Sequence, residues 1–426
     1  MWLRLAAIAV VALAWCSGTA AQTRSVLSLD DAFARVAESH PELRLLGARR
    51  DVLSAERDRA GLRSPLIAGA SIENAFGTGE ASGLQSAELT LSLASVLERG
   101  GKLDARRTLA QSRIDALAVE RESRRLDLLA EVARRYLAMV AAKRQGEIAQ
   151  LDIAQRQRTV AGARQRLQAG ASPESVVLTA QAALARAELE RARAEQAYAA
   201  ARQHLAALWG ERAPTFDIVG ADPLVLPPVA DFATLTTLLD HTPELAQFAD
   251  ERRIREARLQ LARSEVSADL DWQVGVRRLQ ATDDVALIGS VSMPLGARRR
   301  AEPEIRAADA ELASLEIERE AKGLSLYSTL ADAHGSYRTA QLEVERLQKD
   351  VLPRLAKAEA AAERAYRAGA ISYLEWAQLQ SERTSASKQQ LDAALEAQRA
   401  LIEIQRLTGE PFVATPAAPA ATGESP

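Results

Sequence analysis

The sequence has few of the residues on which metal, disulfide and catalytic sites depend. Its 426 residues include one cysteine, Cys16, and four histidines, and no two histidines stand at the spacing of paired metal ligands. These counts argue against a disulfide framework and against a zinc site. We also find no Ser–His–Asp set, no glycine-rich cofactor loop and no grouping of carboxylates. We therefore expect no enzyme, no cofactor and no metal site.

Aromatic residues and long apolar runs are scarce as well. Aromatic residues make up 4% of the chain, although hydrophobic residues reach 47%, and alanine supplies much of that content. A core rich in alanine favours close contact between helices. After the N-terminus, no stretch approaches the roughly 18 apolar residues of a transmembrane helix, so a membrane would have to be crossed by strands. The 54 basic and 57 acidic residues are finely mixed, which argues against a nucleic-acid partner.

The N-terminus has the pattern of a secretory signal peptide. A basic residue precedes the apolar run LAAIAVVALAW, and small residues follow it. We predict cleavage after Ala21, which would leave the exported chain without cysteine. Lipid attachment at Cys16 is the alternative, and Trp15 directly before it argues against that alternative.

A long internal repeat organises the rest of the chain. Residues 39–60 resemble residues 241–262, and residues 169–196 resemble residues 368–395, so the copies are about 200 residues apart. Such a period is too long for a solenoid and indicates two copies of one whole unit. Each copy contains a helix, two alternating segments, a long helix, a short glycine-centred tip and a last helix.

Changes in composition divide the chain into five parts. The predicted parts are a signal peptide at 1–21, a first repeat at 22–210, a linker at 211–231, a second repeat at 232–410 and a tail at 411–426. Four prolines keep the linker non-helical. The tail consists of small residues and proline, and we expect it to be disordered.

The two repeats are expected to contain matching elements. In the first repeat, we predict helices at 29–62, 104–168 and 174–209, a β-hairpin at 65–96 and a tip at 169–173. In the second repeat, we predict helices at 232–264, 301–367 and 372–408, a β-hairpin at 268–295 and a tip at 368–372. Heptad spacing from Leu326 to Val351 predicts a coiled-coil seam, and Pro353 predicts a bend. A helix of about 65 residues is roughly 98 Å long, which predicts a rod with each long helix beside two half-length helices.

The alternating segments predict two β-hairpins. Leu89, Leu91 and Leu93 alternate with Thr90 and Ser92, and each segment has the length of a tilted membrane strand. Four strands are too few to close a barrel, and open edges are not tolerated in lipid. Membrane insertion would therefore require several chains to share one barrel. The alternative is a pair of solvent-facing hairpins on a periplasmic rod.

Glycines mark the places where the chain must reverse or turn. Gly170 and Gly369 stand at the two tips, where a helix ends and the backbone favours positive φ. Gly100 and Gly101 are predicted to form a turn from strand to helix, with Asp104 as the cap of the following helix.

Taken together, the signal peptide, the repeat and the order of elements resemble the TolC-type outer membrane factors. The run LASVLERGGKLDARRTLAQS is similar to the CzcC-like branch, which serves heavy-metal efflux, although Gly296 stands where that branch often has an aromatic residue. The resemblance implies a mainly α protein with a small β part. It further implies a homotrimer in which four strands per chain form one 12-stranded transmembrane β-barrel, continued by a long coiled-coil α-helical barrel.

The resemblance also assigns candidate site residues. Family members dock an adaptor protein at the tips, which places this role on Gly170, Ala171, Ser172, Gly369, Ala370, Ile371 and Ser372. A periplasmic constriction of acidic side chains corresponds to Glu375, and its second position is occupied here by Gln378. The alternatives are tips that only close the hairpins and an ordinary solvated charge at Glu375.

The implied function is that of a passive exit duct in the outer membrane of a Gram-negative bacterium. Its implied partners are a periplasmic adaptor, an inner-membrane transporter of the resistance-nodulation-division type and outer membrane lipid. Divalent heavy-metal cations are one candidate cargo. A soluble periplasmic coiled-coil scaffold and a periplasmic adaptor are the alternative functions.

Overall fold

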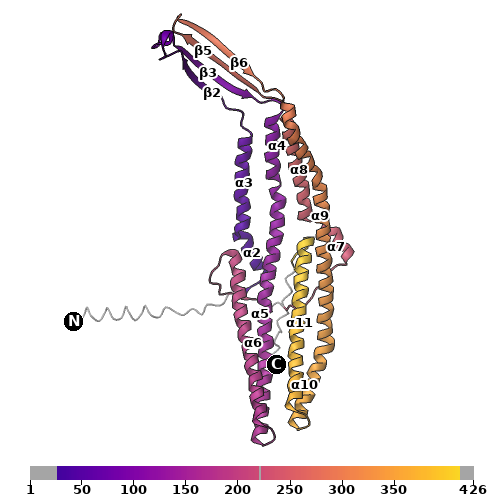
Figure 1. Ribbon diagram of the computed structural model, residues 1–426. Coiled ribbons are helices and arrows are strands. Elements are labelled where there is room, and N and C mark those ends of the chain that lie inside the picture. Colours follow the sequence, from indigo (N-terminus) through magenta and orange to yellow (C-terminus); the bar gives the residue numbers. More distant parts are fainter. Residues whose placement is uncertain (1–25, 220–221, 413–426) are drawn as a thin grey trace, which may run out of the picture.

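The protein is a long rod of helices that carries a small sheet at one end (Figure 1). The computed structural model describes residues 26–219 and 222–412. The predicted signal peptide, Cys16 and most of the predicted tail lie outside these residues. Among the described helices, none is both long and apolar enough to pass through a membrane.

In the described part of the first half, the chain forms three strands and five α-helices. They are β1 (Val26–Leu27), α2 (Leu29–Ser39), α3 (Pro41–Ala60), β2 (Ile67–Glu73), β3 (Glu88–Leu97), α4 (Lys102–Asp115), α5 (Leu117–Gln168) and α6 (Glu174–Ala206). The second half repeats this order with β4 (Asp217–Ile218), α7 (Phe232–Leu239), α8 (Pro243–Ser264), β5 (Leu270–Leu279), β6 (Asp284–Ser292), α9 (Ala297–Arg346), α10 (Leu352–Arg367) and α11 (Tyr373–Thr408).

The first predicted helix of each half is divided in two by a proline. His40 has an extended backbone, with φ −64° and ψ 128°, because the ring of Pro41 disfavours a helical conformation in the preceding residue. Thr242 before Pro243 is extended in the same way, and its hydroxyl accepts a hydrogen bond from the backbone of Leu245. A proline is tolerated in the first turn of a helix, so α3 and α8 both begin at the proline.

The long helix of the second half is interrupted where proline predicts a break. One π-helical turn (Leu347–Val351) joins α9 to α10, directly before Pro353. Such a turn accommodates the missing proline N–H without ending the helix. The predicted seam is buried from Leu326 to Leu347, but Val351 is 37% exposed. The heptad prediction therefore fails at Val351, because the wider turn rotates this side chain out of the seam.

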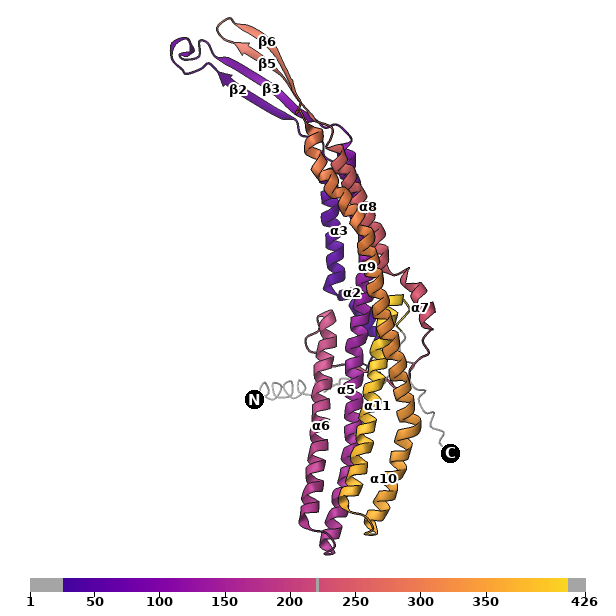
Figure 2. The same cartoon turned by 45° about the vertical axis from the view of Figure 1, so that its right-hand side comes forward.

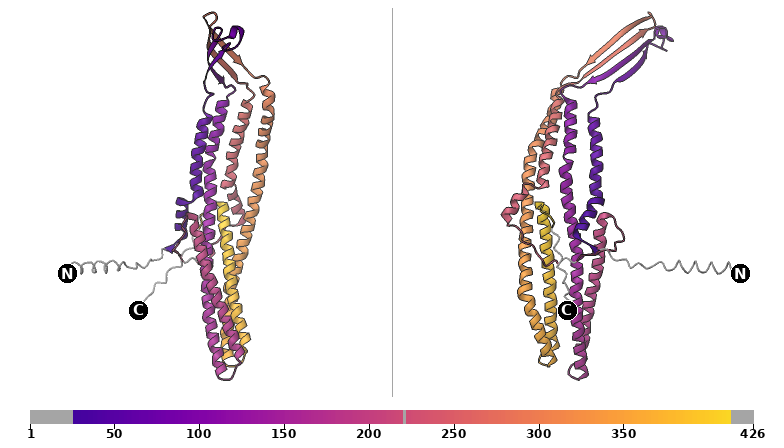
Figure 3. Two further views of the ribbon diagram at one scale, coloured as in Figure 1. Left: turned by 60° about the vertical axis from the view of Figure 1, so that its left-hand side comes forward. Right: turned by 180° about the vertical axis from the view of Figure 1, so that it is seen from behind.

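The remaining helices stack end to end beside the two long ones. Figure 2 shows α3 above α6 and α8 above α11, with α5 and α9 running past both junctions. The two halves lie side by side along the rod when seen from other directions (Figure 3). This arrangement agrees with the one expected from the helix lengths.

Buried tyrosines fix the connecting segments at the middle of the rod. Tyr136 on α5 donates hydrogen bonds to the carbonyl oxygens of Leu27 and Val219, at 3.2 and 3.3 Å. Tyr337 on α9 donates in the same way to the carbonyl of Pro227 in the predicted linker. Burial raises the pKa of Tyr136 to about 12, so the hydroxyl stays protonated and keeps its role as a donor.

Four strands form one antiparallel sheet in the order β2-β3-β5-β6. Its register places the aliphatic side chains of neighbouring strands in common rows, as in the row of Ala70, Leu91, Val276 and Leu287. One face is therefore apolar and the other is mostly polar or small, because side chains alternate along each strand. The large aliphatic side chains of the apolar face are exposed: Ile72, Leu89, Leu91, Leu93, Leu97, Val274, Val276, Val285, Leu287 and Val291.

The turn between β3 and α4 joins the two halves below the sheet. Gly100 and Gly101 have φ values of +76° and +75°, as predicted for this turn. Lys102 is buried, and its ammonium lies 2.9 Å from a carboxylate oxygen of Glu265 and 2.8 Å from one of Asp269. The prediction that Asp104 caps α4 is wrong. The capping residue is Gly101, whose left-handed backbone starts the helix without a side-chain hydrogen bond.

The two glycines of this turn should differ in their response to alanine. A side chain at Gly101 would meet no atom within 4 Å, whereas one at Gly100 would lie 2.5 Å from Cβ of Ser267 and 2.8 Å from the carbonyl oxygen of Ser264. Gly101→Ala should cost about 1–2 kcal/mol for the left-handed backbone alone. Gly100→Ala should cost roughly 3 kcal/mol or more because steric overlap is added. Thermal unfolding of both variants in detergent checks this order, and equal losses would contradict it.

Candidate functional site

The two hairpin tips lie together at the end of the rod opposite the sheet (Figure 2). Gly170 and Gly369 reverse the chain with φ values of +71° and +79°, which confirms the predicted left-handed backbone. The N–H of Gly170 donates to the carbonyl of Leu167 at 2.9 Å, and that of Gly369 donates to the carbonyl of Tyr366 at 3.0 Å. Both tips therefore have the same backbone fold.

The predicted tip residues are mostly accessible. Gly170, Ala171, Gly369, Ala370 and Ser372 are exposed, whereas Ser172 and Ile371 are half-buried. Directly before the tips, Leu167 is exposed and Tyr366 is buried. The structure thus brings all seven predicted residues to one surface of small side chains.

An arginine that the sequence did not single out connects the two tips. The guanidinium of Arg166 donates a 2.6 Å hydrogen bond to the carbonyl of Tyr366 and lies 4.9 Å from the centre of its ring. Ala365 occupies the corresponding position in the second repeat. The repeat alignment could have marked Arg166 as a difference between the tips, but its partner depends on how the two hairpins pack.

An apolar cluster supports this connection from within the rod. It is formed by buried side chains of α5, α6, α10 and α11, namely Val160, Ala163, Val177, Ala180, Ala362, Tyr366, Tyr373 and Trp376. The hydroxyl of Tyr366 and the indole nitrogen of Trp376 are buried without a hydrogen-bond partner among the described residues.

Glu375 caps the helix that follows the second tip. Its carboxylate accepts hydrogen bonds from the backbone N–H of Ser372 at 2.8 Å and from the Ser372 hydroxyl at 2.9 Å. These bonds, the backbone one first, lower the pKa of Glu375 and favour its charged form. The sequence Ser-x-x-Glu after the tip is the signature of a capping box, and the sequence analysis did not use it.

The second position of the predicted constriction carries no charge of its own. Gln378 is exposed, and its amide donates a 3.0 Å hydrogen bond to Glu382 one turn further along α11. Glu375, Gln378 and Glu382 are spaced by three and four residues and therefore lie on one face of the helix. Glu382 supplies an acidic group that the sequence analysis missed.

A buried polar layer fixes the register of α5 against α11 above the tips. Thr159 and Gln380 are almost fully buried and exchange hydrogen bonds of 3.0 and 3.2 Å. One turn away, Arg156 pairs with Asp152 on its own helix at 3.1 Å and also donates to the hydroxyl of Ser381. Because buried polar groups are costly when unpaired, these contacts hold the two hairpins in one alignment.

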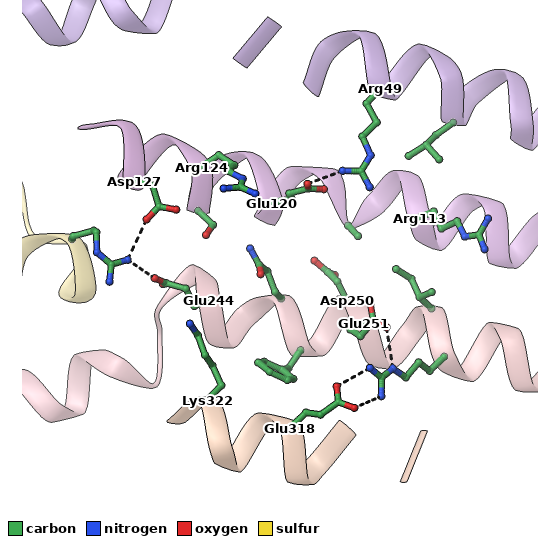
Figure 4. Close-up of a pocket in the computed structure, with 18 residues that line it drawn as sticks. Arg49, Arg113, Glu120, Arg124, Asp127, Glu244, Asp250, Glu251, Glu318 and Lys322 are labelled. Carbon is green, nitrogen blue, oxygen red and sulfur yellow. Dashed lines mark hydrogen bonds and ion pairs between the residues drawn. The ribbon is translucent and has the colours of Figure 1, made fainter. Parts of the chain in front are cut away.

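A cleft at the middle of the rod contains many charged side chains (Figure 4). Its volume is about 830 Å³, and it is lined by α3, α4, α5, α8, α9 and α11. Arg406 lies 3.2 Å from a carboxylate oxygen of Asp127 and 2.9 Å from one of Glu244, so it joins α11, α5 and α8. Because one guanidinium connects three helices, the cleft is a junction between them. Across the part of the chain that the structure describes, no three His, Cys, Asp or Glu side chains could hold a metal ion together.

Comparison with known proteins shows what this chain resembles. Residues 38–211 match the family described as outer membrane efflux protein. The chain is 28% identical over 282 residues to the cobalt-zinc-cadmium resistance protein CzcC of Cupriavidus metallidurans, and the alignment covers 66% of this chain and 67% of that protein.

Solved structures of outer membrane channels have the same fold as this chain. CusC superposes with a TM-score of 0.75 at 17% identity, covering 90% of this chain and 92% of that one. The outer membrane protein VceC of Vibrio cholerae superposes with a TM-score of 0.73 at 17% identity, covering 90% and 97%. The predicted fold class, mainly α with a small β part, is confirmed.

These findings also confirm the broad function and the location. This protein is the outer membrane channel component of a tripartite efflux system, with a long periplasmic part. Its relatives are channels rather than enzymes. The roles of the tip residues, of Glu375 and of Gln378 stay predictions.

Proposed function

We propose that three copies of this protein form one continuous duct from the periplasm to the outside of the cell. The four-stranded sheet carries this proposal. Its edge strands, β2 and β6, pair with no further strand among the described residues. Unpaired backbone groups are very unfavourable in lipid, so each edge requires a partner from another copy.

The directions of the two edge strands allow neighbouring copies to pair in the same antiparallel way as the strands within one copy. β2 runs away from the helices and β6 runs back toward them, so β6 of one copy and β2 of the next would pair antiparallel. Every other pair in this sheet is antiparallel too. Three copies of four strands would then close a barrel of 12 strands, with the exposed aliphatic face toward lipid.

The helices favour the same assembly. None of the 20 residues of α3, all of them described, is buried, and Leu45 and Val52 on this helix are 67% and 57% exposed. On the opposite side of the chain, α9 exposes Ile317 and Leu324 at 69% and 66%. A neighbouring copy would cover these apolar side chains and continue the helical wall.

The tips would be the docking surface for a periplasmic adaptor, and energy would come from an inner-membrane transporter of the resistance-nodulation-division type. Three copies would present six tips, each with small accessible residues around Gly170 or Gly369.

The similarity to a protein named for cobalt, zinc and cadmium resistance supports divalent heavy-metal cations as cargo. Glu375 and Glu382 would then attract cations where the duct begins.

Native mass spectrometry of the protein extracted from the outer membrane fraction tests the assembly. We expect a trimer, because only a closed ring of copies leaves no sheet edge in lipid. Val274→Arg on the apolar face should reduce the amount of trimer in that fraction, because a basic residue near the bilayer centre costs about 2–4 kcal/mol. Gln273→Arg on the other face is the matched control. A soluble monomer or dimer would instead favour a periplasmic scaffold.

The docking role of the tips can be tested in cells that carry the complete efflux system. Ala370→Asp should abolish tolerance to cobalt, zinc and cadmium salts while the trimer remains at its normal level, because a charge then stands on the docking surface. Ala161→Asp, at an exposed site about two turns above the first tip, is the matched control. The test requires that the wild-type protein confers metal tolerance and that its trimer conducts ions. Under these conditions, full metal tolerance of the Ala370→Asp cells would rule out a docking role for this tip.

Recordings from trimers in planar bilayers address the constriction. Glu375→Gln should lower the preference for cations, and Gln378→Glu should raise it, because these changes remove and add a negative charge at the entrance. Ser372→Ala weakens the helix cap but leaves the charge of Glu375 in place. If only Ser372→Ala alters conduction, Glu375 acts through the cap alone.

A further inference from the structure

Charged side chains on the polar face of the sheet gather at the end far from the helices. Glu73 on β2 lies directly opposite Glu88 on β3 in the outermost row, and Arg277 on β5 belongs to the next row. All three lie near the loops that join β2 to β3 and β5 to β6. Within the proposed duct, this position is its outer mouth.

Arg277 connects these carboxylates across three strands. Its Nη1 lies 2.8 Å from Oε2 of Glu88, its Nη2 lies 3.7 Å from Oε2 of Glu73, and its Nε donates to the hydroxyl of Thr90 at 3.0 Å. Thr90 is buried, and the side chain of Glu88 is only 20% exposed. The guanidinium is therefore held in place by three strands.

The middle of the same face carries no charge. The row below Arg277 contains Gly69, Ser92, Gly275 and Ile288, and the next one contains Ile67, Ala94, Gln273 and Ser290. A side chain at Gly275 would lie 2.6 Å from the carbonyl oxygen of Leu91, so this position accepts only glycine without a shift of the backbone. The outer network and Asp271 near the helices are thus separated by two uncharged rows.

We propose that Arg277 determines the charge selectivity of the outer mouth of the duct. The inference rests on the proposed function, because it requires the polar face to line the interior. Asp284 on β6 completes the outermost row of this face. Glu73, Glu88, Asp284 and Arg277 together carry two net negative charges, so three copies would form a ring with six. Arg277 limits the preference of this ring for cationic solutes, and it holds the carboxylates of Glu73 and Glu88 in place along the wall.

The neighbouring arginine provides a matched control. Arg278 points to the apolar face, since successive side chains of a strand alternate. It is 56% exposed and pairs with Asp283 in the loop at 2.6 Å. Arg277→Gln and Arg278→Gln therefore remove the same charge at adjacent positions on opposite faces.

The test is the reversal potential of purified trimers in planar bilayers under a gradient of potassium chloride. One unit charge at roughly 8 Å in water changes a local ion concentration about twofold. Arg277→Gln should therefore raise the ratio of cation to anion permeability about twofold or more, and Glu88→Gln should lower it. Arg278→Gln should leave the ratio unchanged.

The double variant Glu88→Gln/Arg277→Gln distinguishes an effect of charge from an effect of misfolding. It removes both partners of the closest pair and restores the wild-type net charge, and the charged group that loses a contact is the half-exposed Glu73, whose distance to Arg277 is 3.7 Å. Its permeability ratio should return to the wild-type value. Two results from conducting trimers would overturn the inference. One is a permeability ratio of the double variant that stays shifted from the wild-type value, and the other is an equal effect of Arg277→Gln and Arg278→Gln on that ratio. Wild-type protein that forms no conducting trimer would instead refute the proposed function.

Discussion

The structure depends on the contact between the first repeat and the second. This contact continues along the entire rod. It begins with the pairing of β3 and β5, passes through the ion pairs of Lys102 and Arg406, and ends where Arg166 meets Tyr366. Since the contact is made at several levels, the two halves cannot slide past each other without breaking several interactions at once. The alignment of sheet and tips follows from this joint.

The two copies of the repeat share some structural features and differ in others. Tyr136 and Tyr337 keep one task in both halves, because each holds a connecting segment through its carbonyl groups. The tips keep the same backbone fold but begin their last helices differently, with Pro173 in the first and the capping pair of Ser372 and Glu375 in the second. Backbone geometry has thus been retained where side-chain chemistry has diverged.

Most of the fold could be predicted from the sequence because its signals are local. Proline positions, heptad spacing and strand alternation depend on neighbouring residues, and they located the helices, the hairpins and the glycine turns. Asp104 was misjudged as a cap because a glycine with positive φ can begin a helix without a side-chain partner. The capping box at Ser372 was a local signal that was overlooked.

The rest of the candidate site could not be predicted in this way. Arg166 and Tyr366 are 200 residues apart, and the partners of Arg277 come from strands separated by about 190 residues. Which distant side chains meet depends on the register between elements, and alternation alone does not specify that register. The same holds for the pairing of Thr159 with Gln380, which lie 221 residues apart.

The π-helical turn before Pro353 has a consequence for how the lower hairpin is oriented. Beyond it, the buried seam resumes at Glu359, Ala362 and Tyr366. Twelve residues separate Leu347 from Glu359, one more than three regular seam steps would need. A single additional residue turns a regular helix by about 100°, and the wide turn absorbs that rotation locally. The seam of the second long helix can therefore continue on the same side of the rod down to the second tip.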